Sequence, residues 1–293
     1  MNTLYNMKSQ SLGLEGIGNA RELGSYVGAD GKTVRRGVLL RTAMPSYASE
    51  SDRVRLRDEL HLTKVLDFRM RMEYDQSAAP FSTAHATAGS SPADPRDLDF
   101  ADTEHVPILD EEQMMRGYEA QMQLLGDNPS PIGMVLVGVD GGFINERMYI
   151  EFLETEQGKR GYATFFRRLV EQPAGEALLY HCTQGKDRTG LASMLILSLL
   201  GVDEDTILFD YLLTNEFNAG IIQRERQALL QAGIPEEKLD TYMLGMDQVY
   251  EVTMRVAMDH LKQSYGSVWG YIHDALGVSE AERDALRDKY LEA

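Results

Sequence analysis

The chain has 293 residues, of which 43% are hydrophobic, a single cysteine and a formal net charge of −17. Its length favours one elaborated domain over residues 1–293. Its negative charge argues against nucleic acid or an anionic membrane as a partner, because both would repel it. One cysteine excludes an internal disulfide and any metal site that needs several cysteines.

No segment predicts secretion or membrane insertion. The first residues, MNTLYNMKSQSLGLEG, lack a basic region followed by an apolar core, so they are not expected to be a signal peptide. The longest apolar run, Leu191–Leu200, is about half of a membrane span. The six histidines show no helical pair spacing typical of a metal site. We therefore expect a cytoplasmic protein without stable membrane insertion, metal or cofactor.

The first third of the chain is predicted to be mixed α/β. The Asp30-Gly31 pair lies between two short segments of strand character and predicts a hairpin turn. Residues 77–98 are rich in Ala, Ser, Thr and Pro, which is typical of a surface loop. Periodicity predicts three strands and one helix, with the strands at 36–41, 64–69 and 104–109 and the helix at 51–60.

The rest of the chain is predicted to be mainly helical. Residues 110–171 have helical character with two breaks, which indicates either a helical insertion that acts as a lid or a solvent-facing helical layer. Residues 176–181 form a short apolar run suited to a central, buried strand. Beyond Arg188 only helices are expected. This order predicts an α/β fold with a mostly parallel central sheet, flanking helices and a helical C-terminal half.

The segment His181-Cys-Thr-Gln-Gly-Lys-Asp-Arg-Thr-Gly190 lies between the predicted central strand and an apolar helix. A loop that enters a helix N-terminus directs backbone N–H groups and the positive end of the helix dipole toward an anion. Gly185 allows a tight turn and a close approach to that anion. The residues expected to bind phosphate are Thr183, Gln184, Gly185, Lys186, Asp187 and Arg188.

Cys182 has the surroundings of a nucleophile, because a helix N-terminus with nearby cations favours the reactive thiolate. Arg188, six residues later, can donate two N–H groups to phosphoryl oxygens, which lysine cannot do. Thr189 is placed to hydrogen-bond the sulfur, and His181 is expected to order the loop without titrating. The alternative, a buried structural cysteine, is disfavoured by the residues around it.

HCTQGKDRTG resembles the Cys-x5-Arg loop of protein tyrosine phosphatases, and its ending is similar to a bacterial branch related to dual-specificity and lipid phosphatases. Three further segments, Asn19–Tyr26, Arg36–Thr42 and Asp67–Glu73, resemble motifs of that branch, although Glu22 and Ser25 depart from its usual Asp and Gly. The resemblance implies metal-independent hydrolysis of phosphotyrosine through a phosphocysteine intermediate. It also implies activity of some members on phosphoserine, phosphothreonine or phosphoinositides.

Two carboxylates are candidates for the general acid that protonates the leaving group. Asp187 lies inside the loop, as in related phosphatases, and is favoured. Asp110 follows a predicted strand and resembles the Ile-Pro-x-x-Asp position of dual-specificity enzymes. Asp110 could instead be a helix N-cap, and Asp187 could be a structural partner of Arg188 or Lys186.

Two more features bear on the substrate. In related enzymes the lysine equivalent to Lys186 points toward the substrate, which leaves a phosphoinositide as an alternative. Asp67 and Arg69 are expected to pair with each other rather than face the pocket. We predict a tyrosine phosphatase that acts on a phosphotyrosine protein or peptide, with a phosphoinositide phosphatase and a silent phosphate-binding module as alternatives.

Overall fold

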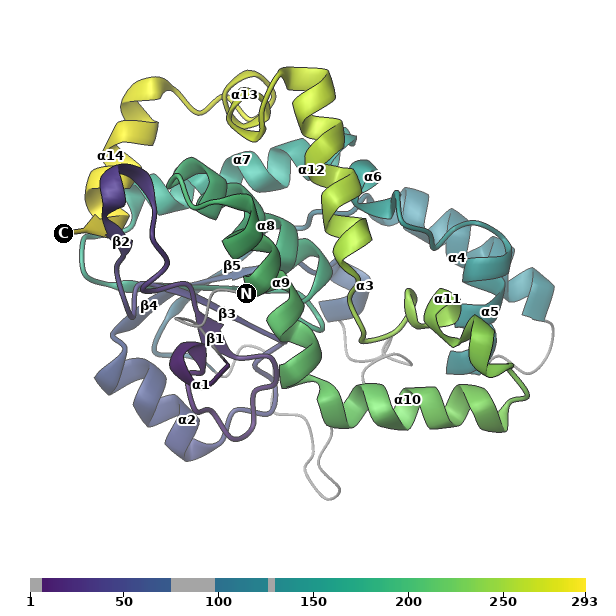
Figure 1. The fold of residues 1–293 in the computed structure, drawn as a ribbon. Helices are drawn as coiled ribbons and strands as arrows, with labels where there is room; N and C mark the ends of the chain where they lie inside the picture. The colour runs from purple at the N-terminus through teal and green to yellow at the C-terminus, as the bar shows by residue number, and fades with distance from the viewer. Residues whose placement is uncertain (1–6, 75–97, 126–129) are drawn as a thin grey trace.

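The molecule is organised around a five-stranded sheet in the order β1-β3-β6-β4-β5 (Figure 1). The computed structural model describes residues 7–74, 98–125 and 130–293, so the predicted loop at 77–98 lies almost entirely outside the described residues. Strand β1 is antiparallel to β3 and the remaining pairs are parallel, which confirms the predicted sheet. The strands are Arg21–Glu22 (β1), Leu39–Thr42 (β3), Leu62–Asp67 (β4), Asp102–His105 (β5) and Ala177–His181 (β6).

The predicted strands are confirmed with shifted ends. Strand β3 begins later than residue 36, because Gly37 turns the chain with a φ of 71°. Strand β5 ends at His105, and Pro107 beyond it has no N–H to extend the ladder. At the Asp30-Gly31 turn both residues have a positive φ and Lys32 N donates to Ala29 O, as in a type I′ turn. The strand after this turn, β2 (Thr33–Val34), pairs with β7 (Leu291–Glu292) at the end of the chain.

The register of the sheet brings three strand ends together. In the central strand β6, His181 lies opposite Thr42 of β3 on one side and Asp67 of β4 on the other. Every residue of β6 is buried, as expected for a strand covered on both faces. The loop after His181 therefore leaves the sheet between two strand ends, where ligands bind in open α/β sheets.

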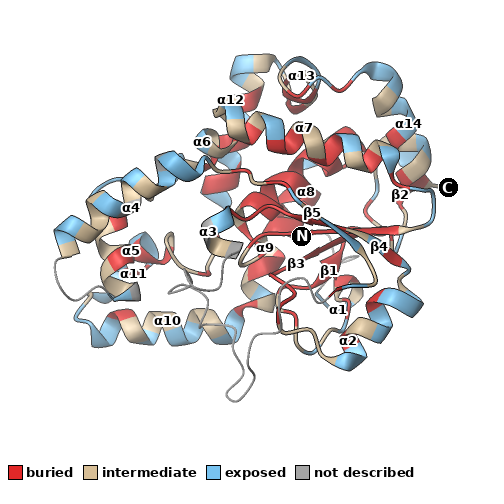
Figure 2. Cartoon of the chain, turned by 180° about the vertical axis from the view of Figure 1, so that it is seen from behind, coloured by how far each residue is buried: buried red, intermediate tan, exposed pale blue. Residues whose placement is uncertain are grey.

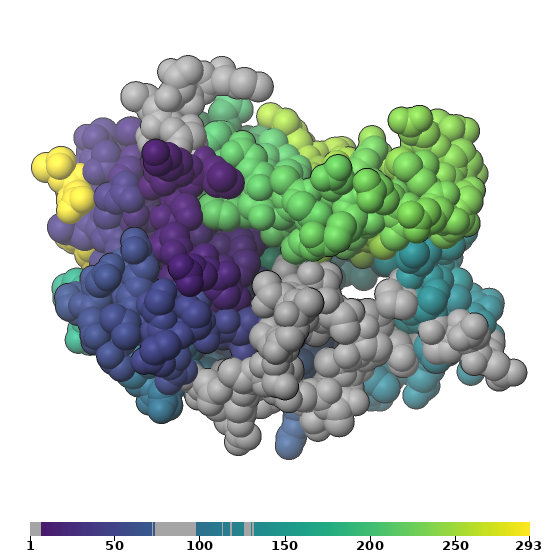
Figure 3. All heavy atoms as spheres, turned by 90° about the horizontal axis from the view of Figure 1, so that it is seen from below, coloured from purple at the N-terminus to yellow at the C-terminus, as the bar shows by residue number. Residues whose placement is uncertain are grey.

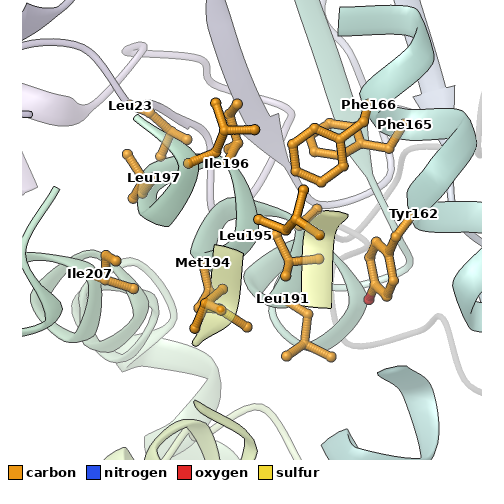
Figure 4. Packing of buried hydrophobic residues seen from close by; sticks show 14 of the residues in the cluster. Leu23, Tyr162, Phe165, Phe166, Leu191, Met194, Leu195, Ile196, Leu197 and Ile207 are labelled. Atoms are coloured by element: carbon orange, nitrogen blue, oxygen red, sulfur yellow. The ribbon is translucent and has the colours of Figure 1, made fainter. Parts of the chain in front are cut away.

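Helices α7 and α8 cover one face of the sheet. Alternate residues Leu178 and Tyr180 face these helices, and Leu179 faces a smaller apolar cluster on the other side. Figure 4 shows the contact between the two helices, with Leu191 and Leu195 near Tyr162. The helices of this layer, and those of the C-terminal half that pack on the same core, are α7 (Glu156–Glu171), α8 (Asp187–Leu199), α9 (Glu204–Phe217), α12 (Glu251–Tyr265), α13 (Val268–Asp274) and α14 (Glu280–Tyr290).

The predicted helix at 51–60 changes its winding midway. Helix α2 (Glu50–Val54) continues into a wider π-helical turn, η2 (Arg55–Glu59). Ser49 caps α2 and forms a capping box with Asp52. Across the described ranges, no helix combines the length and the apolar character that crossing a membrane would require.

The helical segment 110–171 divides into two parts. Helices α4 (Glu111–Leu125) and α5 (Pro131–Asp140) lie away from the sheet, where α5 packs against α11 (Leu239–Met243) beside α10 (Ala219–Gln231) (Figures 1 and 2). In Figure 3 the yellow-green and teal spheres of these helices lie at the opposite end of the molecule from the purple and blue N-terminal residues. Helix α6 (Met148–Glu154), like α7, belongs to the main core instead.

Candidate active site

The loop from Cys182 to Arg188 joins the end of β6 to the start of α8 and is largely buried. Cys182 is 1% exposed and Arg188 is 8% exposed. Gly185 adopts a φ of 65°, and a Cβ added there would lie 2.3 Å from the carbonyl oxygen of Thr42. Only glycine fits both the conformation and the space, so the end of β3 fixes the turn of this loop.

Groups outside the loop hold its carbonyls. Asn19 Nδ2 donates to the carbonyl oxygens of Gln184 at 3.1 Å and Gly185 at 3.0 Å. Arg41 Nη2 donates to the same Gly185 oxygen at 2.8 Å. In a trans peptide the N–H points opposite to the C=O. The N–H groups of Gly185 and Lys186 are thereby directed toward the inside of the loop, where an anion would lie.

A buried ionic cluster supports this arrangement from behind. Asp210 accepts hydrogen bonds from Arg21 Nε at 3.1 Å and Arg41 Nη1 at 2.6 Å, and all three side chains are at most 1% exposed. Tyr26 Oη also donates to Asp210 at 3.1 Å, and Arg21 donates to Asn19. Burial would raise the pKa of Asp210, but the two arginines outweigh it and lower that pKa. The cluster gives a structural role to the segments Asn19–Tyr26 and Arg36–Thr42, which support the loop through Asp210. The sequence alone did not reveal this role.

Glu73 holds Arg188 in place. Its two carboxylate oxygens accept from Arg188 Nη1 at 2.6 Å and Nη2 at 2.8 Å, and Thr183 Oγ1 donates to Oε1 at 2.7 Å. An arginine has five N–H donors, and Nε is among those that Glu73 leaves for a phosphoryl oxygen. Burial would raise the pKa of Glu73, but the charge and hydrogen bonds of Arg188 outweigh it and lower that pKa to about 2. Sequence reasoning placed Glu73 in a motif but assigned it no role.

Replacing Glu73 with glutamine is expected to destabilise the fold by roughly 3 kcal/mol at pH 7, because Arg188 loses its ionised partner. The lowered pKa of Glu73, about 2 against an ordinary 4.5, makes this contribution complete above pH 4.5 and progressively smaller as the pH falls toward 2. Urea unfolding of both proteins between pH 7 and pH 3 measures the difference. A difference that stays constant over this range would contradict the ion pair.

Asp187 begins α8 inside the loop, as predicted. Its Oδ1 accepts a hydrogen bond of 2.6 Å from the Tyr149 hydroxyl, and its Oδ2 lies 3.7 Å from Lys186 Nζ. Lys186 itself is 6% exposed and donates to the carbonyl of Met246. In this structure the ammonium group of Lys186 is thus bonded to a loop of the C-terminal half, and its expected orientation toward a substrate stays a prediction.

Asp110 does not belong to the loop. It is exposed and directly precedes α4, where Met114 N donates to its carbonyl oxygen at 3.0 Å. This is the N-cap position that its alternative interpretation expects. Of the two candidates for the general acid, the structure brings only Asp187 together with Arg188 in one loop.

The residues expected to support the loop are also placed. His181 Nδ1 donates to the Cys182 carbonyl at 3.0 Å, and burial lowers the pKa of His181, which keeps it neutral. Thr189 is fully buried, and its hydroxyl has no hydrogen-bond partner among the described residues, so its bond to sulfur stays a prediction. Asp67 and Arg69 form a buried pair at 2.6 Å, as expected.

Within the described ranges, no group of three or more His, Cys, Asp or Glu side chains could hold a metal ion.

Comparisons with known proteins find relatives that are named phosphatases. A protein of Cupriavidus necator that is provisionally named a tyrosine-protein phosphatase is 30% identical over 282 residues, which cover 96% of this chain and 88% of the relative. The triple specificity protein phosphatase PtpB of Mycobacterium tuberculosis is 35% identical over 124 residues, 39% of this chain and 44% of PtpB. A tyrosine-protein phosphatase of Nostoc commune is 30% identical over 140 residues, 47% of this chain and 46% of the relative.

The family comparison covers nearly the whole chain. The model of the tyrosine phosphatase family matches residues 12–292. The predicted enzyme class, a cysteine-dependent protein-tyrosine phosphatase, is confirmed together with the α/β fold. The chain belongs to the tyrosine phosphatase family.

Proposed function

We propose that Cys182, Arg188 and Asp187 carry the phosphatase reaction of this chain. In the first step the Cys182 thiolate attacks phosphorus and forms an S–P bond as the bond from phosphorus to the leaving oxygen breaks. The Asp187 carboxyl gives its proton to that oxygen, so that the tyrosine leaves as a neutral phenol. Arg188 and the inward N–H groups stabilise the charge on the equatorial oxygens.

The second step returns the enzyme to its starting state. A water oxygen attacks the phosphocysteine, the S–P bond breaks and its electron pair returns to sulfur as the thiolate. Asp187, now ionised, accepts the proton of the attacking water, and inorganic phosphate leaves. No metal or external reductant is needed to balance either step.

The observation that carries the proposal is the position of Arg188. Glu73 fixes the guanidinium beside a loop whose carbonyls are held outward by Asn19 and Arg41. Anion-binding N–H groups and a bidentate cation thus meet beside the buried thiol of Cys182. A silent phosphate-binding module would need the same cradle, but it would have no use for a buried cysteine at its centre.

The substrate that we favour is a phosphotyrosine protein or peptide, with broader activity on phosphoserine and phosphothreonine. PtpB, named for triple specificity, supports this breadth. A phosphoinositide remains the alternative substrate. The sequence feature that supports a phosphoinositide is Lys186. Because its ammonium group donates to the carbonyl of Met246, the peptide is the stronger candidate.

Three further predictions stay proposals. We place the enzyme in the cytoplasm, because its one cysteine must remain a thiolate and a reducing compartment preserves it. We treat residues 1–293 as one phosphatase domain. A mobile lid within 110–171 is proposed only for α4 and α5, because α6 and α7 are part of the main core.

The proposal is tested by phosphate release from a phosphotyrosine peptide and from a monophosphorylated inositol lipid, in buffer without metal and with Cys182→Ser as the blank. Turnover of the peptide that is lost in the blank supports the proposal. Turnover of the lipid alone would favour the alternative substrate. Tight binding of the phosphopeptide without turnover would identify a binding module.

A further inference from the structure

We infer that Tyr149 is a positioning residue for Asp187 and that Tyr211 supports Tyr149 in this role. The inference rests on the proposed function, in which Asp187 is the general acid. It assigns a positioning role to helix α6, which lies within the stretch 110–171 that the sequence analysis interprets as a helical insertion or a solvent-facing layer.

The geometry joins three elements that are far apart in the chain. The Tyr149 hydroxyl of α6 donates to Asp187 Oδ1 at 2.6 Å and lies 2.8 Å from the Tyr211 hydroxyl of α9. Tyr149 is 1% exposed and Tyr211 is 2% exposed, so water does not compete for these bonds. The two tyrosine hydroxyls thus form a series of hydrogen bonds that ends at the carboxylate of Asp187.

The direction of the bonds follows from chemistry. An ionised carboxylate only accepts hydrogen bonds, so Tyr149 donates to Asp187, and the Tyr149 oxygen is left to accept from Tyr211. Burial, together with the charge of Asp187, raises the pKa of Tyr149 well above its ordinary value, and burial raises that of Tyr211 as well. Both phenols therefore stay protonated and remain donors throughout the working pH range.

This bond is stronger after proton transfer than before it. When Asp187 gives up its proton it becomes a carboxylate, and a hydrogen bond to a carboxylate is stronger than one to a neutral acid. Tyr149 thus stabilises the transition state of proton donation more than the ground state. It also occupies Oδ1, which leaves Oδ2 to carry the transferable proton. The second bond, from Tyr211, polarises Tyr149 and adds to the effect.

Packing holds the two tyrosines in place. Their rings meet edge to face, with centroids 6.1 Å apart. A Cβ added to Gly190 would lie 3.2 Å from the Tyr211 ring, so the glycine that ends the loop motif makes room for this side chain. The motif and the tyrosine pair therefore fit each other by shape as well as by hydrogen bonding.

The test compares aryl phosphates whose phenols differ in acidity, from p-nitrophenyl phosphate to phenyl phosphate. The slope of log kcat/KM against leaving-group pKa reports how well the enzyme protonates the leaving oxygen. Tyr149→Phe is expected to lower kcat/KM about 10-fold on phenyl phosphate and much less on p-nitrophenyl phosphate, which steepens the slope. Tyr211→Phe should steepen it less, and Asp187→Asn most, by on the order of 10²-fold on phenyl phosphate.

The matched control is Tyr271→Phe. Tyr271 is fully buried, and its hydroxyl donates at 2.6 Å to the carbonyl of Leu153 on the same helix α6. Its removal loosens α6 without touching Asp187, and it should leave the slope unchanged. Thermal unfolding of each variant establishes that it is folded.

The outcomes are distinguishable. A steeper slope in Asp187→Asn with an unchanged slope in Tyr149→Phe would overturn the inference while leaving the proposed acid in place. An unchanged slope in Asp187→Asn would remove Asp187 from the role of general acid and the inference with it. A slope that steepens equally in Tyr271→Phe would show a structural effect of α6 alone and would also overturn the inference.

Discussion

Arg188→Lys is expected to lower kcat on a phosphotyrosine peptide on the order of 10³-fold. Lysine keeps the positive charge but is a compact cation on a flexible stem. It cannot bind both oxygens of Glu73 and present further N–H groups to the phosphoryl group, which Arg188 does from a single planar guanidinium. Steady-state kinetics with the peptide, together with the affinity for vanadate, measure the loss.

The chain offers a matched control in Arg168→Lys. Arg168 also binds a glutamate in a bidentate way, with Nε and Nη2 at 2.6 Å and 2.8 Å from the carboxylate of Glu104, but it lies on α7 and its partner on β5, away from the loop. The same substitution there should leave kcat within about twofold of the unmodified enzyme, because a partly exposed ion pair contributes little. Equal losses in the two variants would show that the effect is one of general stability.

Asp210→Asn is expected to lower the free energy of unfolding by about 3–5 kcal/mol, because it leaves two buried arginines without a countercharge. Arg21 and Arg41 are both fully buried against this carboxylate. The amide is close to the carboxylate in shape, so the loss reports charge rather than packing. Urea unfolding at pH 7 measures it, and kcat should fall as well, because Arg41 also supports the Gly185 carbonyl.

Asp240→Asn serves as the comparison. Asp240 pairs with Arg226 at 2.7 Å, but its side chain is 67% exposed. Removal of an exposed charge of this kind should cost at most about 1 kcal/mol. A loss for Asp210→Asn no larger than this would mean that the buried arginines find another countercharge or water.

Much of the fold was predictable because local signals agreed with the global arrangement. The apolar run before His181 is buried on both faces, and a run of that kind is typical of a central parallel strand. The loop residues were identified by their spacing, since a strand, a glycine turn and a helix start make an anion site wherever they occur. The start of β3 and the end of β5 were less predictable, because Gly37 delays the one and Pro107 limits the other.

The supporting contacts were not predictable, because they depend on segments that only the folded chain brings together. Glu73 contacts Arg188 across 115 positions and Tyr149 contacts Asp187 across 38. No periodicity or spacing encodes such a pair in a single sequence. The partner of Lys186 was equally unpredictable, because Met246 lies in a loop that follows α11 and that has no recognisable motif.

The central position of β6 in the sheet also affects when the enzyme can fold during its synthesis. Strand β6 pairs with β3 on one side and with β4 on the other, yet the ribosome makes it long after both. Until then the two earlier strands have no central partner, and pairings across so long a stretch of chain form slowly. Because the catalytic loop follows β6 directly, thiol and arginine meet only once the sheet has closed, and a nascent chain of this enzyme remains inactive until its core has folded.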